Sequence, residues 1–352
     1  MTNTTTGTMT AEARELREVV VRLVEERGRP GTLDESLVLW DELVGLGVRD
    51  IGVAEDRGGS GGTLAELAAV AIALAEQGVS VPLVEASAGR WAAAARGLDA
   101  PADADGLISV GSPGVASPGA GSGSGADVAL PWGRAATAAV VCRADEARLV
   151  PVQRLRESEN LAGEPLDTMS LDDGAWRAAP VLAVPPAVVL DRAALLRAAA
   201  LFGAARGAYT LTREYTRERQ QFGGPLLDLP AVAGHLATMK VELVQAEAAL
   251  TRAVALAEET DAERASSAVR VATVICSGVA GEVARLAHQL HGAIGITAEY
   301  PLHHFTRRIW AWRDFPGPAA EAARELGTAA LAGGESHVWS ELTGWYPVMT
   351  GE

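Results

Sequence analysis

The feature that most constrains this chain is a set of three long apolar stripes in its C-terminal part. Apolar residues recur at steps of three and four across residues 195–209, 232–253 and 268–290, the second series with near-heptad spacing. This spacing places the apolar residues of each series on one face of an α-helix. Because long, alanine-rich helices bury such faces against one another, the sequence predicts an antiparallel helical bundle.

The N-terminal part is also predicted to be helical, with one interruption. Residues 12–27, 33–45 and 64–77 have helical patterns, and Thr63 is a suitable N-cap for the third segment. In the intervening stretch VRDIGVAEDRGGSGG, the glycines at positions 58, 59, 61 and 62 indicate a tight loop. By itself this part predicts only a helical domain.

The middle of the chain has the character of short strands. The runs DVALPW, TAAVVCR, ARLVPV and AAPVLAVP are valine-rich and separated by polar breaks, which favours a small antiparallel sheet. Residues 111–126 are rich in glycine, serine and proline and are typical of a loop or linker. The order of helices, strands and long helices predicts an α+β protein with domains at residues 1–105, 106–189 and 190–352.

Composition excludes several classes of function. The 352 residues include 30 basic and 45 acidic side chains, a formal net charge of −15, which argues against nucleic acid or anionic lipid as the main partner. Only two cysteines, Cys142 and Cys276, are present, too few for a disulfide scaffold or a cysteine-based zinc site. No run approaches the roughly 20 consecutive apolar residues of a membrane helix, and the N-terminus lacks the apolar core of a signal peptide. We therefore expect a soluble, cytoplasmic protein.

Two segments near the C-terminal stripes have the residue types of a ligand site. RERQQFG, residues 217–223, places guanidinium and amide groups beside a glycine where a long helix ends, which suits a planar grip on phosphate oxygens. QLHGAIG, residues 289–295, has two glycines within four residues, so that a ligand can approach the backbone closely. On spacing alone, an arginine and a glycine at a helix end also fit a solvated cap.

Together, three motifs resemble the acyl-CoA dehydrogenase family. RERQQFG resembles the family's helix ending in Arg-x-x-Phe-Gly, and QLHGAIGITAEYPLHHFTRRIWAWR resembles its Gln-x-x-Gly-x-x-Gly-x-x-x-Glu-x-Pro segment. VAEDRGGSGGTLAELAAVAIALAEQG resembles its N-terminal glycine loop and the helix that follows. The motifs occur in the family's order and cover most of the chain. The resemblance implies an N-terminal helical domain, a middle β-domain and a C-terminal four-helix bundle.

The resemblance also implies a cofactor and a reaction. The family binds FAD across a subunit interface and oxidises an acyl-CoA thioester to the 2,3-enoyl-CoA, with a carboxylate as the base for the α-proton. The chain matches the family positions that hold the diphosphate and adenine side of FAD. These positions are Arg219, Gln221, Phe222, Gln289, Gly292 and the backbone of Ala293.

The catalytic half of the family site is not matched. The two positions at which family members carry the glutamate base read Pro316 and Ala193, and residues 107–180 lack the family's flavin- and substrate-gripping stretches. A chain that keeps the cofactor clamp without the base resembles the non-catalytic subunit of a heteromeric, sterol side-chain-degrading acyl-CoA dehydrogenase. The resemblance then implies a role in lipid or steroid catabolism, a homologous catalytic subunit as partner, acyl-CoA as substrate and one FAD per pair of chains.

Other interpretations remain open. A slip of alignment register would allow Asp314, Glu299 or Asp191 to serve as the base of a self-contained FAD-dependent enzyme. A structural homologue without flavin, or an unrelated reaction on the same fold, would also fit.

Two further groups of residues invite a functional interpretation that the sequence does not favour. His288 and His291 lie three apart on a predicted helix, within reach of one ion, but no carboxylate or cysteine pattern completes a coordination shell. We therefore predict no metal site. Trp310 and Trp312 stand beside arginines, which is typical of core or subunit packing.

Overall fold

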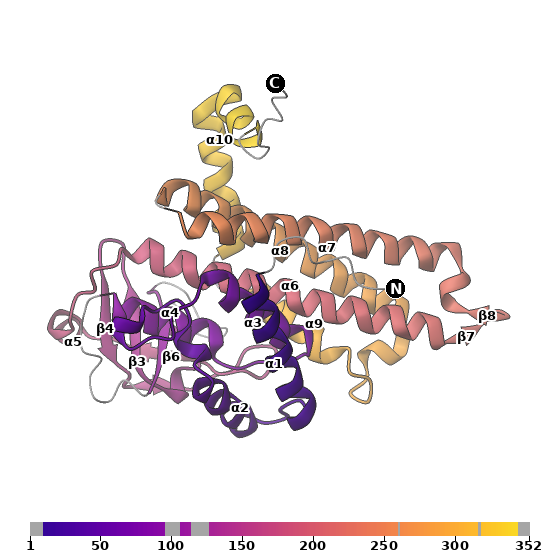
Figure 1. Ribbon diagram of the computed structural model, residues 1–352, viewed down its shortest axis with the longest axis horizontal. Helices are drawn as coiled ribbons and strands as arrows, with labels where there is room; N and C mark the ends of the chain where they lie inside the picture. Colours follow the sequence, from indigo (N-terminus) through magenta and orange to yellow (C-terminus); the bar gives the residue numbers. More distant parts are fainter. Residues whose placement is uncertain (1–9, 96–105, 114–126, 260, 316–317, 344–352) are drawn as a thin grey trace.

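The computed structural model describes residues 10–95, 106–113, 127–259, 261–315 and 318–343. Helices from both ends of the chain surround a region of short strands (Figure 1), which confirms the predicted α+β class. The α-helices are α1 (Ala11–Arg27), α2 (Leu33–Gly45), α3 (Leu64–Glu76), α4 (Leu83–Ala94), α5 (Asp173–Ala178), α6 (Pro186–Glu218), α7 (Pro230–Ala257), α8 (Ala262–His291), α9 (His303–Arg313) and α10 (Pro318–Thr343). The strands are β1 (Leu107–Gly111), β2 (Asp127–Pro131), β3 (Ala136–Cys142), β4 (Ala147–Pro151), β5 (Leu155–Arg156), β6 (Leu166–Ser170), β7 (Gln220–Gln221) and β8 (Gly224–Pro225).

Threonine side chains fix the start of two N-terminal helices. Thr32 caps α2 and Thr63 caps α3, and in each case a glutamate three residues later bonds back to the N-cap backbone. This reciprocal arrangement satisfies amide groups that would otherwise lack partners. The predicted role of Thr63 is confirmed, and α4 is an additional helix that the sequence pattern did not single out.

Strands β1 to β6 form two small sheets instead of the single antiparallel sheet that the sequence predicted. Their orders are β1-β3-β4 and β2-β6-β5, and β1 runs parallel to β3 while the other pairs in these two sheets are antiparallel. Strand β3 lies between two hydrophobic clusters, because its side chains alternate between its two faces. Ala139 and Val141 pack between the sheets, whereas Val140 and Cys142 pack towards α4 and the start of α6.

The run AAPVLAVP is not a strand, which corrects the fourth strand prediction. It lies beside β4 through a bridge between Arg148 and Val181 and a hydrogen bond from the Leu149 N–H to the Pro180 carbonyl, 3.1 Å long. Proline removes a backbone donor, so this edge segment cannot continue a hydrogen-bonded ladder. Strands β1, β5 and β6 were not predicted.

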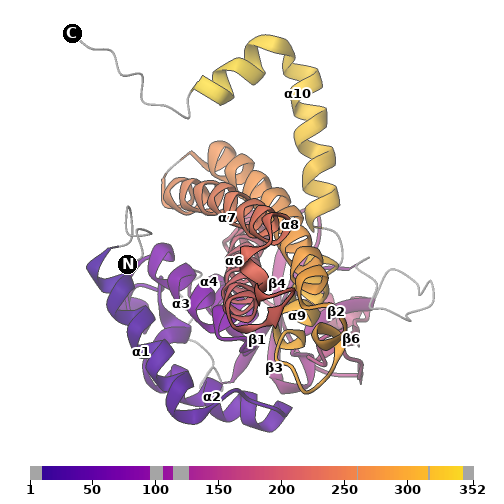
Figure 2. The same cartoon turned by 90° about the vertical axis from the view of Figure 1, so that its right-hand side faces the viewer.

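The long helix α6 connects the strand region to the far end of the bundle. Its 33 residues span about 50 Å at 1.5 Å per residue. Val189 and Ala193 near its start pack with the strand cluster, and the residues from Leu195 to Ala208 join the main helical core. Helices α7, α8 and α9 pack along α6, and α10 begins beside α8 and then projects away from the bundle, as Figure 2 shows end-on.

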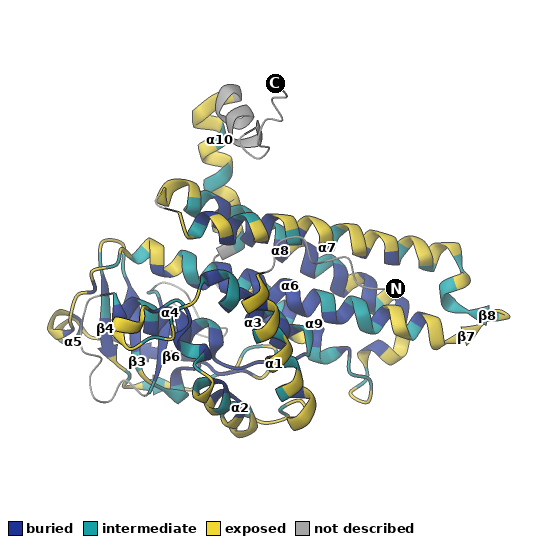
Figure 3. Cartoon of the chain, viewed as in Figure 1, coloured by how far each residue is buried: buried dark blue, intermediate teal, exposed yellow. Residues whose placement is uncertain are grey.

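Burial follows the predicted stripes, with the buried side chains concentrated where α6, α7 and α8 face one another (Figure 3). The helical stretch Ala262–Ile296 is long and apolar enough to cross a membrane by length and composition, although the sequence led us to expect no such segment. In its most apolar window, 56% of the residues are buried within the structure. A buried core helix can have the same length and apolar composition, so this stretch is only weak evidence for a membrane span.

Candidate functional site

The first predicted segment forms a tight hairpin directly after α6. Strands β7 and β8 pair with each other, and the two residues between them, Phe222 and Gly223, have φ angles of 54° and 91°. Two-residue hairpin loops favour such positive values, but a non-glycine residue there costs about 1–3 kcal/mol. The side chain of Phe222 is 84% exposed, so packing within the described chain does not offset this cost. The hairpin therefore has the features of a contact with another molecule.

Arg219 combines a fixed backbone with an open side chain. Its N–H donates to the Tyr215 carbonyl and its carbonyl accepts from the Leu226 N–H, both at 2.9 Å. Its guanidinium is exposed and forms no hydrogen bond or ion pair with any residue that the structure describes. Gln221, two residues on, is also exposed. A positioned, unpaired guanidinium of this kind can bind phosphate oxygens with charge-assisted hydrogen bonds.

The second predicted segment caps α8. Gly292 has φ 61° and ψ −140°, and its N–H donates to the His288 carbonyl. A Cβ at this position would meet nothing within 4 Å, so glycine is needed for its backbone conformation and also leaves the backbone open to approach. Gln289 and Ala293 are exposed on either side of this glycine.

Aromatic contacts hold these two segments at the same end of the bundle, far from the sheets of β1 to β6 (Figure 1). Tyr215 of α6 stacks on His291 of α8, with ring centroids 4.5 Å apart and an interplanar angle of 23°. Tyr300, from the loop before α9, contacts both rings at 5.6 and 4.9 Å. The six predicted cofactor-binding residues thus occupy two exposed segments that flank one aromatic cluster.

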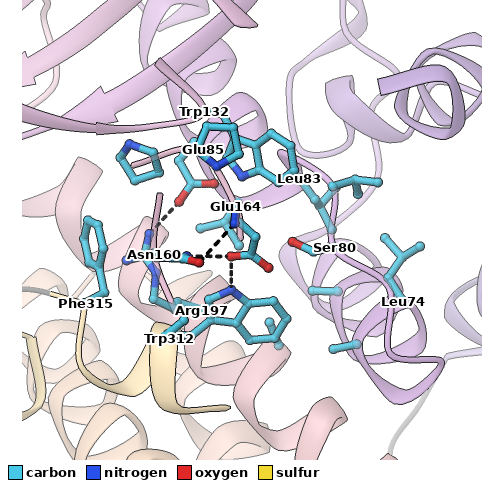
Figure 4. A pocket seen from close by; sticks show the side chains of 18 of the residues that line it. Leu74, Ser80, Leu83, Glu85, Trp132, Asn160, Glu164, Arg197, Trp312 and Phe315 are labelled. Atoms are coloured by element: carbon cyan, nitrogen blue, oxygen red, sulfur yellow. Dashed lines mark hydrogen bonds and ion pairs between the residues drawn. The ribbon is translucent and has the colours of Figure 1, made fainter. Parts of the chain in front are cut away.

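The interior cavity between the strands, α3, α4, α6 and α9 is filled by polar and aromatic side chains (Figure 4). Glu85 of α4 forms an ion pair with Arg197 of α6 at 2.6 Å, and both side chains are largely buried. Glu164 accepts hydrogen bonds of 2.8 Å from Trp312 Nε1 and from Asn160 Nδ2. The remaining space is about 60 Å³, well below the roughly 300–1,000 Å³ of ligand pockets.

A second cavity of about 300 Å³ lies beyond the Glu85–Arg197 pair, bounded by α6, α8 and α10. The guanidinium carbon of Arg197 is 4.2 Å from the centroid of the Phe315 ring. Glu85, Arg197 and Phe315 line both cavities and form the wall between them. Asp191 lines the second cavity and accepts a 2.6 Å hydrogen bond from Ser266. Burial of this carboxyl group raises its pKa.

The candidate base positions are dispersed. Pro316 lies outside the residues that the structure describes. Ala193 is buried beside the second cavity and offers no carboxylate. Asp314 is exposed and ion-paired with the preceding arginine at 2.7 Å, and Glu299 is exposed at the hairpin end of the bundle, where hydrogen bonds lower its pKa. Of the three acids, Asp191 best fits a partly desolvated base.

The histidine and tryptophan residues have structural contacts. His288 Nε2 lies 3.1 Å from the Thr306 hydroxyl, and its ring stacks on Trp310 at 5.4 Å. His291 is part of the aromatic cluster, and within the described ranges no group of three or more His, Cys, Asp or Glu side chains is arranged to hold a metal ion. Trp310 packs against the helical core and Trp312 bonds Glu164 in the interior cavity.

The charged residues of the interior cavity were not predicted from the sequence. Glu85 and Arg197 each lie in an alanine-rich helix among buried neighbours. A charged residue in such a sequence indicates that it has a buried partner of opposite charge. Glu164 follows a short loop and has no such signal. Its partners come from residues 160, 308 and 312, so only the folded chain reveals the cluster.

Comparison with known proteins agrees with this architecture. The profile of the acyl-CoA dehydrogenase C-terminal domain matches residues 187–330. Acyl-CoA dehydrogenase IpdE2 of Mycolicibacterium smegmatis is 27% identical over 330 residues, covering 90% of this chain and 98% of that protein. Residues 187–330 therefore match the C-terminal domain of the acyl-CoA dehydrogenase family, and the chain is similar to a member of that family over 90% of its length.

Two solved structures with the same fold are named for two components. The Tcur3481-Tcur3483 steroid acyl-CoA dehydrogenase G363A variant has a TM-score of 0.78 and 22% identity, covering 93% of this chain and 99% of that chain. The ChsE4-ChsE5 complex from Mycobacterium tuberculosis has a TM-score of 0.75 and 21% identity, covering 92% and 98%. At these identities the likeness establishes the fold alone.

Proposed function

We propose that this chain is the non-catalytic, FAD-clamping subunit of a heteromeric acyl-CoA dehydrogenase that oxidises a steroid-derived acyl-CoA to its 2,3-enoyl form. The observation that carries the proposal is an asymmetry between two sites. The segments at the bundle end are open and exposed, whereas the interior cavity leaves about 60 Å³. The names of the two-component structural neighbours support a heteromeric assembly with steroid-derived substrates.

The bundle end fits the diphosphate and adenine half of FAD. Arg219 offers a guanidinium without a partner among the described residues, and a phosphate oxygen pair is the acceptor that its planar geometry suits. Phe222 offers an exposed apolar ring, and Gly292 lets a ligand approach the α8 cap. Gln289, Gln221 and the Ala293 backbone add exposed polar groups.

The interior cavity does not fit the flavin ring. Its two carboxylates, Glu85 and Glu164, are engaged with Arg197, Trp312 and Asn160, so neither is a free base. Bound FAD supplies the hydride acceptor of the family reaction. In this proposal a homologous partner subunit holds the flavin ring and provides the carboxylate that takes the α-proton, while this chain binds and orients the other half of the cofactor.

Purification of the chain alone and with its partner tests the proposal. The chain is expressed by itself and together with a homologous acyl-CoA dehydrogenase chain that carries the family glutamate. We expect the chain alone to be colourless and unable to reduce an electron acceptor with acyl-CoA, and the pair to be yellow and active. A yellow, active homo-oligomer would contradict the proposal.

A second candidate function is favoured by Asp191. Its carboxyl group lines a cavity of about 300 Å³, its pKa is raised by burial, and it lies two residues from the alternative base position at Ala193. In this alternative the chain is a self-contained dehydrogenase with Asp191 as base. Asp191→Asn would then abolish activity of the isolated chain, whereas the favoured proposal predicts no activity to lose.

A further inference from the structure

An aromatic cluster joins the ends of α6, α8 and the loop before α9. It consists of Tyr215, His291 and Tyr300, with ring centroids separated by 4.5 Å (Tyr215–His291), 4.9 Å (His291–Tyr300) and 5.6 Å (Tyr215–Tyr300). His291 is only 4% exposed and contacts both tyrosines, which are half-buried and also contact each other. Aromatic pairs at these separations are attractive beyond their burial.

Hydrogen bonding fixes the His291 ring. His291 Nδ1 lies 2.8 Å from the Ala287 carbonyl, and since a carbonyl only accepts, this nitrogen carries the proton. Nε2 is buried without a partner among the described residues, so a second proton would have no acceptor there. Burial lowers the pKa of His291. The ring is therefore held neutral and in one tautomer, which suits a fixed stacking partner.

The cluster touches both cofactor segments through the backbone. Tyr215 accepts the 2.9 Å hydrogen bond from the Arg219 N–H with its carbonyl oxygen, at the point where α6 gives way to the hairpin. His291 directly precedes Gly292, and Gly295 packs so closely that a Cβ there would lie 2.8 Å from the His291 Cβ. Movement of the Tyr215 and His291 rings apart would thus separate the two segments.

We propose that Tyr215, His291 and Tyr300 are positioning residues that set the spacing between Arg219 and the Gly292 turn, and thereby the affinity for FAD. This inference rests on the proposed cofactor clamp. The three rings do not bind the cofactor themselves. A binding site must hold its groups within about 0.5 Å of the productive geometry. Because the hairpin has little packing of its own, the three rings fix its position relative to the Gly292 turn.

Another aromatic pair provides a matched control. His288 and Trp310 stack with centroids 5.4 Å apart and an interplanar angle of 12°, and this pair joins α8 to α9. It does not involve α6 or the hairpin. Trp310→Ala should therefore reduce stability in the manner of an aromatic truncation but keep the contact between α6 and α8 that spaces the two cofactor segments.

FAD affinity of the co-expressed complex tests the inference. After removal of flavin, FAD is titrated into complexes that carry Tyr215→Phe, Tyr215→Ala, Trp310→Ala or Arg219→Ala, with thermal midpoints measured in parallel. Tyr215→Phe keeps the stacked ring and should bind as the parent does. Tyr215→Ala removes the pairs with His291 and Tyr300 and should raise the FAD dissociation constant at least about tenfold, the scale of one aromatic pair. Trp310→Ala should change it less than about twofold.

The outcomes separate the inference from the proposed function. If Arg219→Ala weakens FAD binding but Tyr215→Ala does so no more than Trp310→Ala, the positioning role is wrong and the clamp stands. If Arg219→Ala leaves FAD binding unchanged, the clamp itself is wrong. Should Tyr215→Ala fail to fold, Tyr300→Leu replaces it with an apolar side chain at the cluster's edge, and parent-like affinity in that variant would overturn the positioning role.

Discussion

The buried ion pair between Glu85 and Arg197 gives a direct test of the filled interior cavity. Its two side chains are 8% and 12% exposed and their charged atoms lie 2.6 Å apart. Arg197→Met removes the cation and leaves the carboxylate of Glu85 buried without it. Breaking one partner of such a pair costs about 3–5 kcal/mol, whereas replacing both with apolar groups of similar volume is close to neutral.

The expected change in thermal stability follows from chain length. At about 2.1 cal/mol/K per residue, 352 residues give an unfolding entropy of about 0.7 kcal/mol/K. A loss of about 3 kcal/mol in Arg197→Met then lowers Tm by about 4 °C. The Glu85→Leu/Arg197→Met double variant should recover most of that loss, because it leaves no unpaired charge.

Urea unfolding followed by far-ultraviolet circular dichroism measures the cycle. Arg285→Met serves as a control, since the Arg285–Glu282 pair is exposed and its removal should leave the midpoint unchanged. The double variant should also retain the parent's FAD content in the complex, because the proposal gives this cavity no role in cofactor binding. The Glu85→Leu single variant completes the cycle. An Arg197→Met variant as stable as the parent, or a double variant whose loss in stability equals the summed losses of the two single variants, would refute the reasoning.

Two further predictions concern the bundle end, and a third concerns α9. Arg219→Ala should weaken FAD binding to the complex by about 2–4 kcal/mol without dissociating the two chains; retained FAD in a flavin titration would favour a purely structural subunit. Gly295→Ala should lower the free energy of unfolding by about 1–3 kcal/mol, because its Cβ would lie 2.8 Å from the His291 Cβ; an unchanged urea midpoint would contradict this close packing. Burial lowers the pKa of His304 from 6.5 to about 4, so the unfolded chain takes up the proton first and stability should fall as pH decreases from about 6.5 to about 4. His304→Asn should make the urea midpoint less dependent on pH in that range, and an unaltered slope would exclude this histidine as the cause.

The helices could be predicted because their signal is local. The stripes of α7 and α8 repeat every three or four residues, and Thr63 with its glutamate defines the start of α3. The sheets depend on pairing between distant segments, which local propensity does not specify. In β6, Asp167 is buried because Arg134 reaches it from 33 residues earlier at 2.8 Å, so a sequence that looks polar is a core strand.

The same difference separates the two halves of the candidate site. Arg219, Phe222 and Gly292 belong to short contiguous motifs at helix ends, so the sequence was sufficient to nominate them. The interior cavity combines Glu85, Glu164 and side chains from α6 and α9, which approach only after folding. A single buried charge in this cavity would cost too much desolvation energy, and the ion pairs offset that cost. No local sequence pattern indicates which charged residues will pair in this way.

Counting FAD per chain in the assembled protein tests the central claim most directly. Native mass spectrometry of the co-expressed complex gives the number of each chain and of bound FAD in one measurement. The account predicts one FAD for each pair of unlike chains and none on this chain when it is purified by itself. One FAD on every copy of this chain in a homo-oligomer would contradict the division of the site between two subunits.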